Sequence, residues 1–379
     1  MEHLTIGILG AGQLGRMLAL AGYPLGLRFR FLDPAPDGPA GHMAEHIGGS
    51  YEDTTLLQHF SKGLAALTYE FENVPVAAAR ALASRVPVYP PPAALEAAQD
   101  RLAEKMFFQS IGATTPPFEP IDSRADLEAA IARIGLPAVL KTRRLGYDGK
   151  GQAVLREPGD VEAAWATLGG SALILEGFIP FERELSILAA RGRNGETAFY
   201  PLVENHHRGG ILRLSLAPAP SLTPALQAEA EQIASRALKA LEYVGVLAIE
   251  LFQVSRDRQP AAHHLPSSNS DLLVNEMAPR VHNSGHWTIE GAETSQFEQH
   301  LRAVLGYPLG STLARGYSAM VNLIGDLPDP AEVLAIPGAH LHLYGKAPRP
   351  GRKVGHITIR ADEQDDLQVC LARVRTLIR

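Results

Sequence analysis

The stretch LTIGILGAGQLGRMLALAGYPLGLRFRFLD, residues 4–33, predicts how the chain begins to fold. An apolar run of strand length is followed by the turn GAGQLG and by the helical pattern RMLALAGYPLG. A second apolar run, LRFRFLD, ends at Asp33. Two such runs separated by a helical repeat and a glycine turn are typical of a β-α-β unit. Further strands are expected at residues 65–71 and 86–90, so residues 1–98 predict a small, doubly wound, Rossmann-like α/β domain.

The turn of this unit carries a glycine motif that has more than one interpretation. Gly10, Gly12 and Gly15 spell G-x-G-x-x-G, and Asp33 stands 18 residues after the last of them, which is a dinucleotide fingerprint. The same turn can hold a single phosphate at the helix N-terminus. No set of residues for hydride transfer is visible. We therefore interpret the loop as a site for an anion and leave the identity of the ligand open. An NAD-dependent dehydrogenase is kept as an alternative.

The rest of the chain predicts two more parts, with an α+β arrangement in the central one. Expected helices there lie at residues 93–111, 124–134, 159–168 and 224–243. Expected strands lie at residues 137–142, 172–178, 184–191, 197–205, 245–254 and 271–280, with an exposed hairpin loop at 256–270. A smaller β-rich part follows, with strands at residues 318–325, 340–346 and 355–360 and a helix at about 364–378. The expected domains are 1–98, 99–298 and 299–379.

Composition limits the classes of protein. The 379 residues include 46% hydrophobic and 20% charged ones, which is a globular mixture, and the net charge of −6 argues against nucleic-acid binding. The one cysteine, Cys370, cannot form an internal disulfide. We see no signal peptide and no apolar run of about 18 residues. We therefore expect a cytoplasmic protein that binds no membrane.

Two acidic residues stand inside apolar strands. Strand alternation places Glu250 on the face of Val246 and Ala248, and Glu276 on the face of Leu272 and Val274. A carboxylate in such a setting costs several kcal/mol unless it is paired or binds a metal. If the two strands are antiparallel neighbours, both carboxylates converge with Asn275, and the pair suits a magnesium-bound nucleotide.

Four other segments carry polar groups that suit phosphates or a nucleotide. Lys141 and the glycine-rich GYDGKGQ, residues 146–152, can neutralise and cover phosphates. Residues 176–179 can meet an adenine edge, and Glu184 can accept from ribose hydroxyls. The cluster RVHNSGHW, residues 280–287, suits an anion. Four cations lie within residues 346–353 and suggest a phosphate site, namely Lys346, Arg349, Arg352 and Lys353.

These segments together resemble a known family. GAGQLG, LKTRRLGYDGKGQ (140–152), ILEGFI (174–179), GVLAIELF (245–252), NEMAPRVHNSGHW (275–287) and YGKAPRPGRKVGH (344–356) are similar to the ATP-grasp ligases of purine synthesis. The specific resemblance is to the 5-(carboxyamino)imidazole ribonucleotide synthase family. It implies a Rossmann-like first domain, an ATP-grasp domain and a small C-terminal domain. It also implies a homodimer.

The resemblance implies an ATP-dependent carboxylation. ATP phosphorylates bicarbonate to carboxyphosphate, and 5-aminoimidazole ribonucleotide becomes N5-carboxyaminoimidazole ribonucleotide, with ADP and phosphate as the other products. The resemblance assigns the nucleotide contacts to Arg101, Lys141, Gly146, Tyr147, Asp148, Gly149, Lys150, Gly151, Gln152, Glu176, Gly177, Phe178, Ile179, Glu184, His207, Asn275 and Glu276. It assigns the Mg²⁺ ligands to Glu250 and Glu276. The expected ribonucleotide contacts are Gln13, Leu14, Glu70, Asn283, Ser284, His286, Lys346, Arg352 and Lys353. The expected catalytic residues are Tyr147, Asp148, Lys150 and Arg280.

Two further alternatives remain at this point. Formate-dependent glycinamide ribonucleotide transformylase has the same three-part layout and also forms an acyl phosphate, as do other ATP-grasp ligases. Gln13 and the string HNSGHW favour the carboxylase. A non-catalytic nucleotide-binding regulator is the other alternative, and the two strand carboxylates argue against it because binding alone does not need them.

Overall fold

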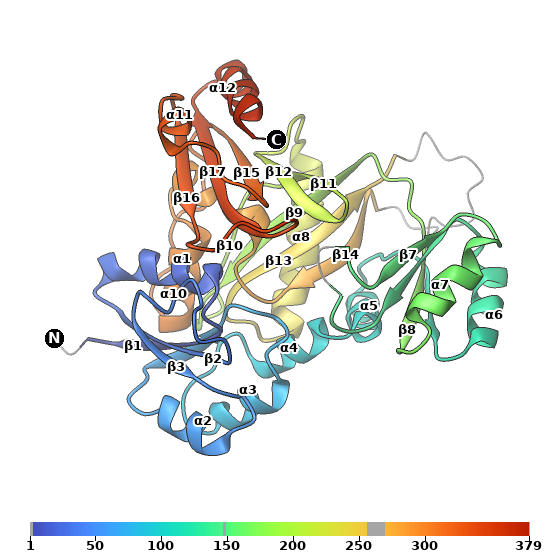
Figure 1. Ribbon diagram of the computed structural model, residues 1–379, viewed down its shortest axis with the longest axis horizontal. Helices are drawn as coiled ribbons and strands as arrows, with labels where there is room; N and C mark the ends of the chain where they lie inside the picture. Colours follow the sequence, from blue (N-terminus) through green and yellow to red (C-terminus); the bar gives the residue numbers. More distant parts are fainter. Residues whose placement is uncertain (1–2, 147–148, 256–269, 379) are drawn as a thin grey trace.

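A computed structural model of the protein describes residues 3–146, 149–255 and 270–378. It contains three sheets with helices packed on them, which confirms the predicted mixed α/β class (Figure 1). The first sheet has the order β3-β2-β1-β4, and all its pairs are parallel. Its strands are β1 (Thr5–Leu9), β2 (Arg28–Asp33), β3 (Glu45–Gly48) and β4 (Ala66–Tyr69). The expected β-α-β opening is therefore confirmed.

The helices of this part follow the strands closely. They are α1 (Gln13–Gly22), the short 3-10 helix η1 (Tyr23–Leu25), α2 (Thr54–Phe60), α3 (Val76–Ala83) and α4 (Pro92–Ala98). The strand expected at residues 86–90 is reduced to one parallel bridge between Leu67 and Val88. Pro87 and Pro90 have no backbone N–H, and this prevents a longer ladder there.

The helix expected at residues 93–111 is divided in two, which corrects the prediction. It ends at Ala98, and α5 (Arg101–Ser110) begins after Asp100. The backbone of Asp100 is extended, and its side chain accepts a hydrogen bond from Leu102 N at 3.0 Å. An aspartate in this position satisfies a free amide of a new helix, so it begins α5 and interrupts the periodic pattern.

A small antiparallel sheet lies at one end of the molecule, to the right in Figure 1. Its order is β5-β8-β6-β7. The strands are β5 (Phe118–Ile121), β6 (Ala138–Thr142), β7 (Gln152–Leu155) and β8 (Leu173–Gly177), and the helices are α6 (Arg124–Ile134) and α7 (Asp160–Leu168). One apolar cluster joins them, with Leu127 of α6 and Val161 of α7 against Leu140 and Leu175 of the sheet.

The largest sheet has nine strands and is antiparallel throughout. Its order is β14-β13-β9-β11-β12-β15-β17-β16, with β10 paired to β9. The strands are β9 (Arg183–Arg191), β10 (Thr197–Phe199), β11 (Val203–Arg208), β12 (Ile211–Ala217), β13 (Gly245–Gln253), β14 (Leu272–Ala278), β15 (Tyr317–Ile324), β16 (Ala339–Leu343) and β17 (Lys353–Ala361). The strands expected in the small C-terminal part, β15 to β17, therefore extend the central sheet by way of β12.

Helices cover both faces of this sheet. On one face α5 and α8 (Pro224–Ala240) pack through Phe108 and Ile233 against Leu247. On the other face α1 and α10 (Gln296–Leu305) share one apolar cluster with Val246 and Ala248 of β13. The remaining helical segments are η2 (Asn283–Gly285), α9 (Thr288–Gly291), α11 (Pro330–Leu334) and α12 (Gln364–Leu377). Glu250 stands two and four residues after Ala248 and Val246, so its side chain lies on the same face of the sheet and points toward the N-terminal part.

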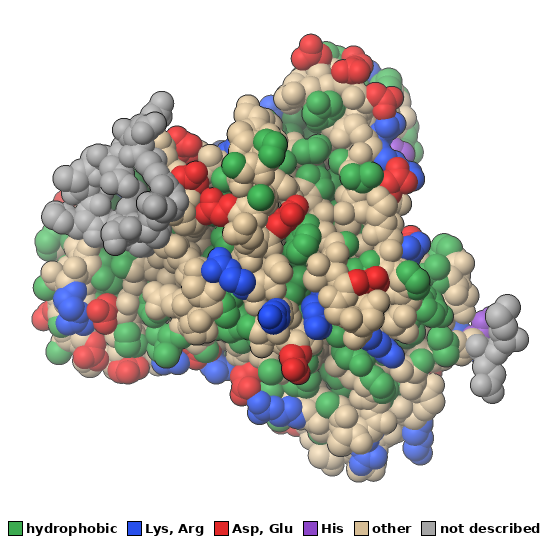
Figure 2. Space-filling view, turned by 180° about the vertical axis from the view of Figure 1, so that it is seen from behind, with side chains coloured by type: hydrophobic (Ala, Val, Ile, Leu, Met, Phe, Trp, Pro, Cys, Tyr) green, Lys and Arg blue, Asp and Glu red, His purple; other side chains and the backbone are tan. Residues whose placement is uncertain are grey.

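The surface mixes charges of both signs. On the face shown in Figure 2, basic and acidic side chains are interspersed, as the totals of 35 Lys and Arg and 41 Asp and Glu lead one to expect. Within the described residues, every helix is too short or too polar to cross a membrane. The hairpin loop expected at 256–270 lies outside the described residues except for Ser270.

Candidate active site

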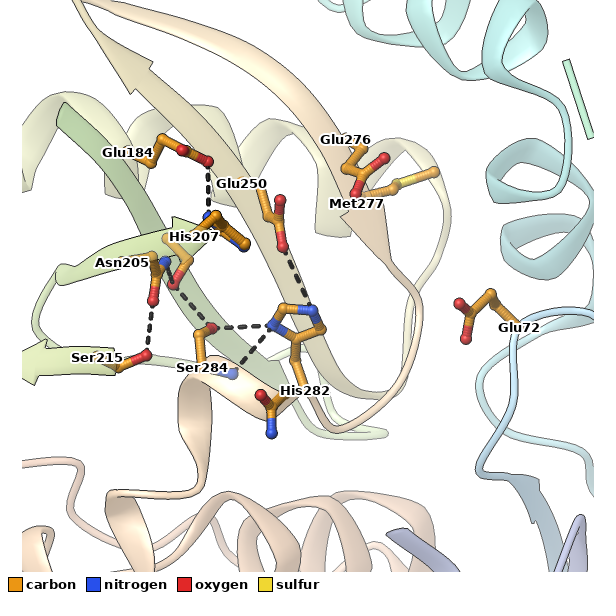
Figure 3. A network of polar contacts seen from close by, with 12 residues as sticks. Glu72, Glu184, Asn205, His207, Ser215, Glu250, Glu276, Met277, His282 and Ser284 are labelled. Atoms are coloured by element: carbon orange, nitrogen blue, oxygen red, sulfur yellow. Dashed lines mark hydrogen bonds and ion pairs between the residues drawn. The ribbon is translucent and has the colours of Figure 1, made fainter. Parts of the chain in front are cut away.

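The two acidic residues predicted from the sequence lie opposite each other. β13 and β14 are antiparallel neighbours, as expected, and Glu250 pairs directly with Glu276 (Figure 3). The expected face of Glu276 is wrong, however. The register shifts between Glu250 and Leu251, where Asn275 is the extra residue of a β-bulge, and Val274 packs into the opposite core. A bulge reverses the alternation of side chains, and here it brings both carboxylates to one face.

The two carboxylates differ in acidity. Burial, reinforced by the charge of Glu276, raises the pKa of Glu250 to about 7. Burial also acts on Glu276, but Arg101 outweighs it and lowers the pKa of Glu276 to about 2. Arg101 Nη1 lies 2.6 Å from Glu276 Oε2. At neutral pH the pair therefore presents negative charge that a cation can neutralise.

Two lysines meet at Glu176, next to this pair. Lys141 Nζ lies 3.0 Å and Lys105 Nζ 3.3 Å from Glu176 Oε2. Burial alone would raise the pKa of Glu176, but both lysines lower it to about 2. Glu176 Oε1 is buried without a hydrogen-bond partner among the described residues. Lys141, predicted to neutralise phosphate, is thus held in place by a carboxylate of the expected adenine segment.

Adjacent residues of α5 hold the free edge of β14. Glu104 Oε1 accepts from Met277 N at 2.6 Å, and Lys105 Nζ donates to Asn275 O at 2.6 Å. Both side chains are almost fully buried. They replace the hydrogen bonds of a missing neighbour strand on either side of Glu276. Asn275 Oδ1 is buried and has no partner among the described residues.

The expected adenine segment, residues 176–179, ends β8. The N–H groups of Gly177 and Phe178 donate to Pro117 O at 2.9 Å and Pro137 O at 3.2 Å. Those two N–H groups are therefore used within the chain, and the expected contact of the segment with adenine stays a prediction. Phe178 is partly exposed, and Ile179 is buried.

The glycine-rich segment after β6 approaches the turn between β11 and β12. Gly149 has a φ of 74°, and a Cβ there would lie 2.9 Å from Gly210 Cα. Only glycine fits both the left-handed backbone and this contact. The segment also includes Gly146, Lys150, Gly151 and Gln152, whereas Tyr147 and Asp148 lie outside the described residues.

His207 and Glu184, two expected nucleotide contacts, lie next to each other. His207 Nδ1 lies 2.9 Å from Glu184 Oε2 (Figure 3). Burial alone would lower the pKa of His207, but Glu184 and the charges of Glu250 and Glu276 raise it. The histidine is therefore paired with Glu184 and lies close enough to the carboxylate pair to feel its charge.

The turn after β14 places Arg280 and His282 beside the pair. Arg280 Nε is ion-paired with Glu72 of the N-terminal part, and Arg280 Nη1 donates to Val281 O at 2.9 Å. His282 Nε2 lies 3.4 Å from Glu250 Oε1. Burial and the charge of Arg280 lower the pKa of His282 to about 3, so this ring is neutral.

The hairpin between β16 and β17 faces the first glycine loop. Lys346 Nζ donates to Gln13 Oε1 at 2.5 Å. Burial lowers the pKa of Lys346, although the nearby charge of Glu70 opposes this. Arg352 and Lys353 lie close enough to act on the same lysine. Four other predicted substrate contacts, from opposite ends of the chain, are thus brought together around Lys346, namely Gln13, Glu70, Arg352 and Lys353.

Family models match three consecutive parts of the chain. The family model described as "ATP-grasp domain" matches residues 106–297. The "Ribonucleotide synthetase preATP-grasp domain" matches residues 3–99, and the "Phosphoribosylaminoimidazole carboxylase C-terminal domain" matches residues 318–369. The N5-carboxyaminoimidazole ribonucleotide synthase of Pseudomonas aeruginosa is 54% identical, covering 99% of each chain.

The chain belongs to the N5-carboxyaminoimidazole ribonucleotide synthase family.

Solved structures of this family have the same fold. The synthetase of Thermus thermophilus is 63% identical, with a TM-score of 0.91 and 98% of each chain covered. The synthase of Aspergillus clavatus, in complex with ADP and 5-aminoimidazole ribonucleotide, is 30% identical, with a TM-score of 0.87 and 99% of each chain covered. The predicted resemblance and the ATP-grasp ligase class are confirmed, and the transformylase and dehydrogenase alternatives are set aside.

Part of the glycine loop is occupied by carboxylates of the chain itself. Glu70 accepts hydrogen bonds from Gly12 N and from Gly15 N, the latter at 2.6 Å. Asp33 Oδ2 accepts from Ala11 N at 2.8 Å. The amides of Ala11, Gly12 and Gly15 are therefore not available to a ligand in this conformation.

Three further predicted contacts lie in the interior. Ser284 and His286 are almost completely buried, and Ser284 Oγ is bonded to Ser186 and His282. Their expected substrate contacts are therefore corrected: the polar cluster turns inward to satisfy the loop. The side chain of Leu14 packs into the main apolar core, leaving only its backbone for a ligand. Asn283 exchanges two hydrogen bonds with Asn322, so its amide is also held.

Sequence reasoning missed several residues of the candidate site. Glu104 and Lys105 lie in the expected helix 93–111 but were not singled out, and no local pattern marks them as buried. Glu72 stands two residues after Glu70 beyond an apolar strand, a signal that could have suggested it. His282 lay inside the singled-out string RVHNSGHW but was given no role.

Proposed function

We propose that this chain carboxylates 5-aminoimidazole ribonucleotide with bicarbonate and ATP, as a step of de novo purine biosynthesis. The products are N5-carboxyaminoimidazole ribonucleotide, ADP and phosphate. The observation that carries the proposal is the carboxylate pair, which has Arg101 on one side and the basic hairpin on the other. Lys353 acts on the charge of Glu250 from that hairpin. The Aspergillus clavatus structure with ADP and 5-aminoimidazole ribonucleotide supports it.

The nucleotide would lie between the small sheet and the edge of the large one. Arg101 and Lys141 supply positive charge for phosphate oxygens, and the glycine segment 146–152 supplies backbone donors above them. Residues 176–179 border the adenine, and Glu184 accepts from the ribose. His207, held by Glu184, donates toward the phosphates. Relatives bound to ADP or ATP support this placement.

The residues present fit a magnesium ion. Glu250 and Glu276 are direct cross-strand partners, and the neighbouring Asn275 Oδ1 is a buried oxygen without a partner among the described residues. Mg²⁺ prefers one or two protein carboxylates and takes its other oxygens from phosphate and water. When bound, the ion would neutralise charge on the phosphoryl group during transfer.

The ribonucleotide would lie against the N-terminal part. Lys346, Arg352 and Lys353 supply three positive charges for its phosphate. Gln13, Leu14 through its backbone, Glu70 and Asn283 line the same region. Glu70, already fixed by the glycine loop, keeps a rigid acceptor for ribose hydroxyls. The approach of this region to Glu250 would place the exocyclic amine near the site of phosphoryl transfer.

The chemistry needs positioning and charge more than a covalent nucleophile. Bicarbonate attacks the terminal phosphoryl group of ATP and forms carboxyphosphate, and the amine then takes the carboxyl group as phosphate leaves. Positive charge on Arg280 and Lys150 stabilises the transferred group, and Tyr147 and Asp148 border the reacting amine. Carboxyphosphate hydrolyses readily, so the glycine segment serves to exclude water.

Three predictions of the sequence are retained here as part of the proposal. They are the domain limits 1–98, 99–298 and 299–379, the homodimer and the cytoplasmic location. The matches to three consecutive family models support the division of the chain.

The proposal is tested by ADP release from the purified protein with Mg-ATP in bicarbonate-depleted buffer. We expect release that requires 5-aminoimidazole ribonucleotide, rises with added bicarbonate and yields an acid-labile carboxylated product. Glycinamide ribonucleotide with formate is the control and should give none. Turnover with that control alone, or ADP release that ignores bicarbonate, would contradict the proposal.

A further inference from the structure

A chain of buried polar side chains leads from β12 to the carboxylate pair (Figure 3). Ser215 Oγ donates to Asn205 Oδ1 at 2.7 Å, and Asn205 Nδ2 donates to Ser186 Oγ at 2.9 Å. Ser186 Oγ in turn donates to Ser284 Oγ at 2.8 Å. The three serines are fully buried and Asn205 is 5% exposed, so water does not replace these contacts.

The chain ends on one nitrogen of His282. Ser284 Oγ lies 2.9 Å from His282 Nδ1, and Ser284 N donates to the same atom at 3.3 Å. A backbone N–H can only donate, so Nδ1 accepts and carries no proton. The proton of the neutral ring is therefore on Nε2, the nitrogen that lies 3.4 Å from Glu250 Oε1.

The hydrogen bonds of the chain point in one direction. The amide of Asn205 is its only group whose donor and acceptor ends are fixed in place, because the hydroxyls can rotate. With its oxygen toward Ser215 and its nitrogen toward Ser186, each following hydroxyl must donate toward His282. Asn205 thus sets the polarity of the chain from a strand that does not contact Glu250.

We propose that Asn205 is a positioning residue that, through Ser186 and Ser284, holds His282 as the tautomer with Nε2–H directed at Glu250. The inference rests on the proposed function of Glu250. Without the chain, only the longer hydrogen bond from Ser284 N, at 3.3 Å, keeps the proton off Nδ1, and the tautomer whose bare Nε2 lone pair faces the carboxylate becomes populated. Mutation of hydrogen-bond partners that orient the groups around a metal site commonly lowers activity or metal affinity by about 10- to 100-fold.

The tautomer is measured directly on the full-length, substrate-free protein. The chain has 14 histidines, so the His282 signals in a two-bond ¹H–¹⁵N spectrum are assigned by their loss in His282→Gln. We expect one Nε2–H tautomer in the natural protein. We expect a mixture with the Nδ1–H form in Asn205→Ala and in Ser186→Ala. The second variant removes a single buried oxygen and guards against a folding failure of the first.

Ser318→Ala is the matched control. Ser318 is also a fully buried strand serine, and its hydroxyl has no hydrogen-bond partner among the described residues. This variant should leave the tautomer of His282 and the kinetics unchanged. In the two chain variants kcat should fall about tenfold, whereas the KM for ATP should change less than about twofold.

Three results would overturn the inference. They are an Nδ1–H tautomer in the natural protein, an unchanged tautomer in both chain variants, and an unchanged kcat despite a changed tautomer. The spectra need no turnover. If the natural protein does not carboxylate the ribonucleotide, the proposed function fails, and the tautomers alone then decide whether the chain acts on His282.

Discussion

Glu276 and Glu250 are cross-strand partners with opposite shifts of pKa, and the cations beside Glu276, Arg101 first among them, account for the difference. Arg101 contacts Glu276 at 2.6 Å and keeps it ionised, whereas burial raises the pKa of Glu250. Their shared face depends on the bulge at Asn275. The sequence correctly predicted that Glu250 and Glu276 lie on neighbouring antiparallel strands. Simple alternation predicted the wrong face of the sheet for Glu276.

The substitution Glu276→Ala should abolish turnover while the protein still folds. It removes a proposed metal ligand and the partner of Arg101, so kcat should fall by about 100-fold or more. ADP production and the unfolding temperature are the measurements. Glu204→Ala is the control, since Glu204 pairs with Arg183 and His206 in the same sheet. Near-normal ADP production by Glu276→Ala would contradict the metal assignment.

The substitution Arg352→Ala should weaken binding of the ribonucleotide specifically. Loss of a charge-assisted contact to phosphate should raise the KM for the ribonucleotide about tenfold and leave that for ATP nearly unchanged. Steady-state kinetics with each substrate varied in turn measure this. Arg349→Ala, an exposed arginine of the same hairpin, should change neither constant by much. Equal effects of Arg352→Ala on both constants would exclude a role at the substrate phosphate.

At the scale of elements, the sequence predicted the bounds of a helix or strand best where the residues that begin and end it are adjacent to it in the chain. Helix α6 begins at its Ser123 cap and ends at Gly135, as expected. β12 was not predicted, although the side chains of ILRLSLA alternate between apolar and polar. Glu70 could not be placed from sequence, since its bond to Gly15 joins residues 55 positions apart. The same holds for Lys105, whose burial depends on β14.

Asp100, which caps α5 after the break from α4, should make the stability of the protein depend on pH. Asp100 caps α5 and binds Arg143 through both carboxylate oxygens, at 3.0 and 2.8 Å. Burial alone would raise the pKa of Asp100, but Arg143 lowers it below its usual range. The ionised carboxylate therefore stabilises the fold above the unfolded pKa of about 3.9, and this is lost as pH falls through the folded pKa.

The measurement is the unfolding temperature of the natural protein and of Asp100→Asn between pH 7 and pH 3. We expect the natural protein to be more stable at pH 7 and the difference to shrink toward pH 3. Asp329→Asn, at the exposed cap of α11, should give a smaller difference at pH 7. A difference that grows on acidification would have the wrong sign for a depressed pKa.

At the scale of the whole molecule, the central and C-terminal parts share one sheet and one core. Leu214 of β12 belongs to the same apolar cluster as Ile359 of β17 and Leu371 of α12. The sequence predicted a separate C-terminal unit over residues 299–379. Pairing of β12 with β15 joins residues about a hundred positions apart, which no local pattern reveals.

This sharing predicts that the two parts unfold together. Ile359→Ala should destabilise the protein by about 2 to 5 kcal/mol, because the side chain is fully buried. Calorimetry should show one transition of the central and C-terminal parts, shifted as a whole. Val369→Ala, at a position 63% exposed, is the control and should have little effect. A separate C-terminal transition that moves alone would contradict the shared core.

The buried charges of α5 also bear on how the protein avoids self-association. A strand at the border of a large sheet exposes unpaired N–H and C=O groups that can template pairing with another chain and seed aggregates. Glu104 and Lys105 occupy such groups of β14 at Met277 and Asn275. The strand that carries Glu276 is therefore closed to intermolecular β-pairing at these two positions, and the side chains that fix the candidate site also cover the border of the sheet.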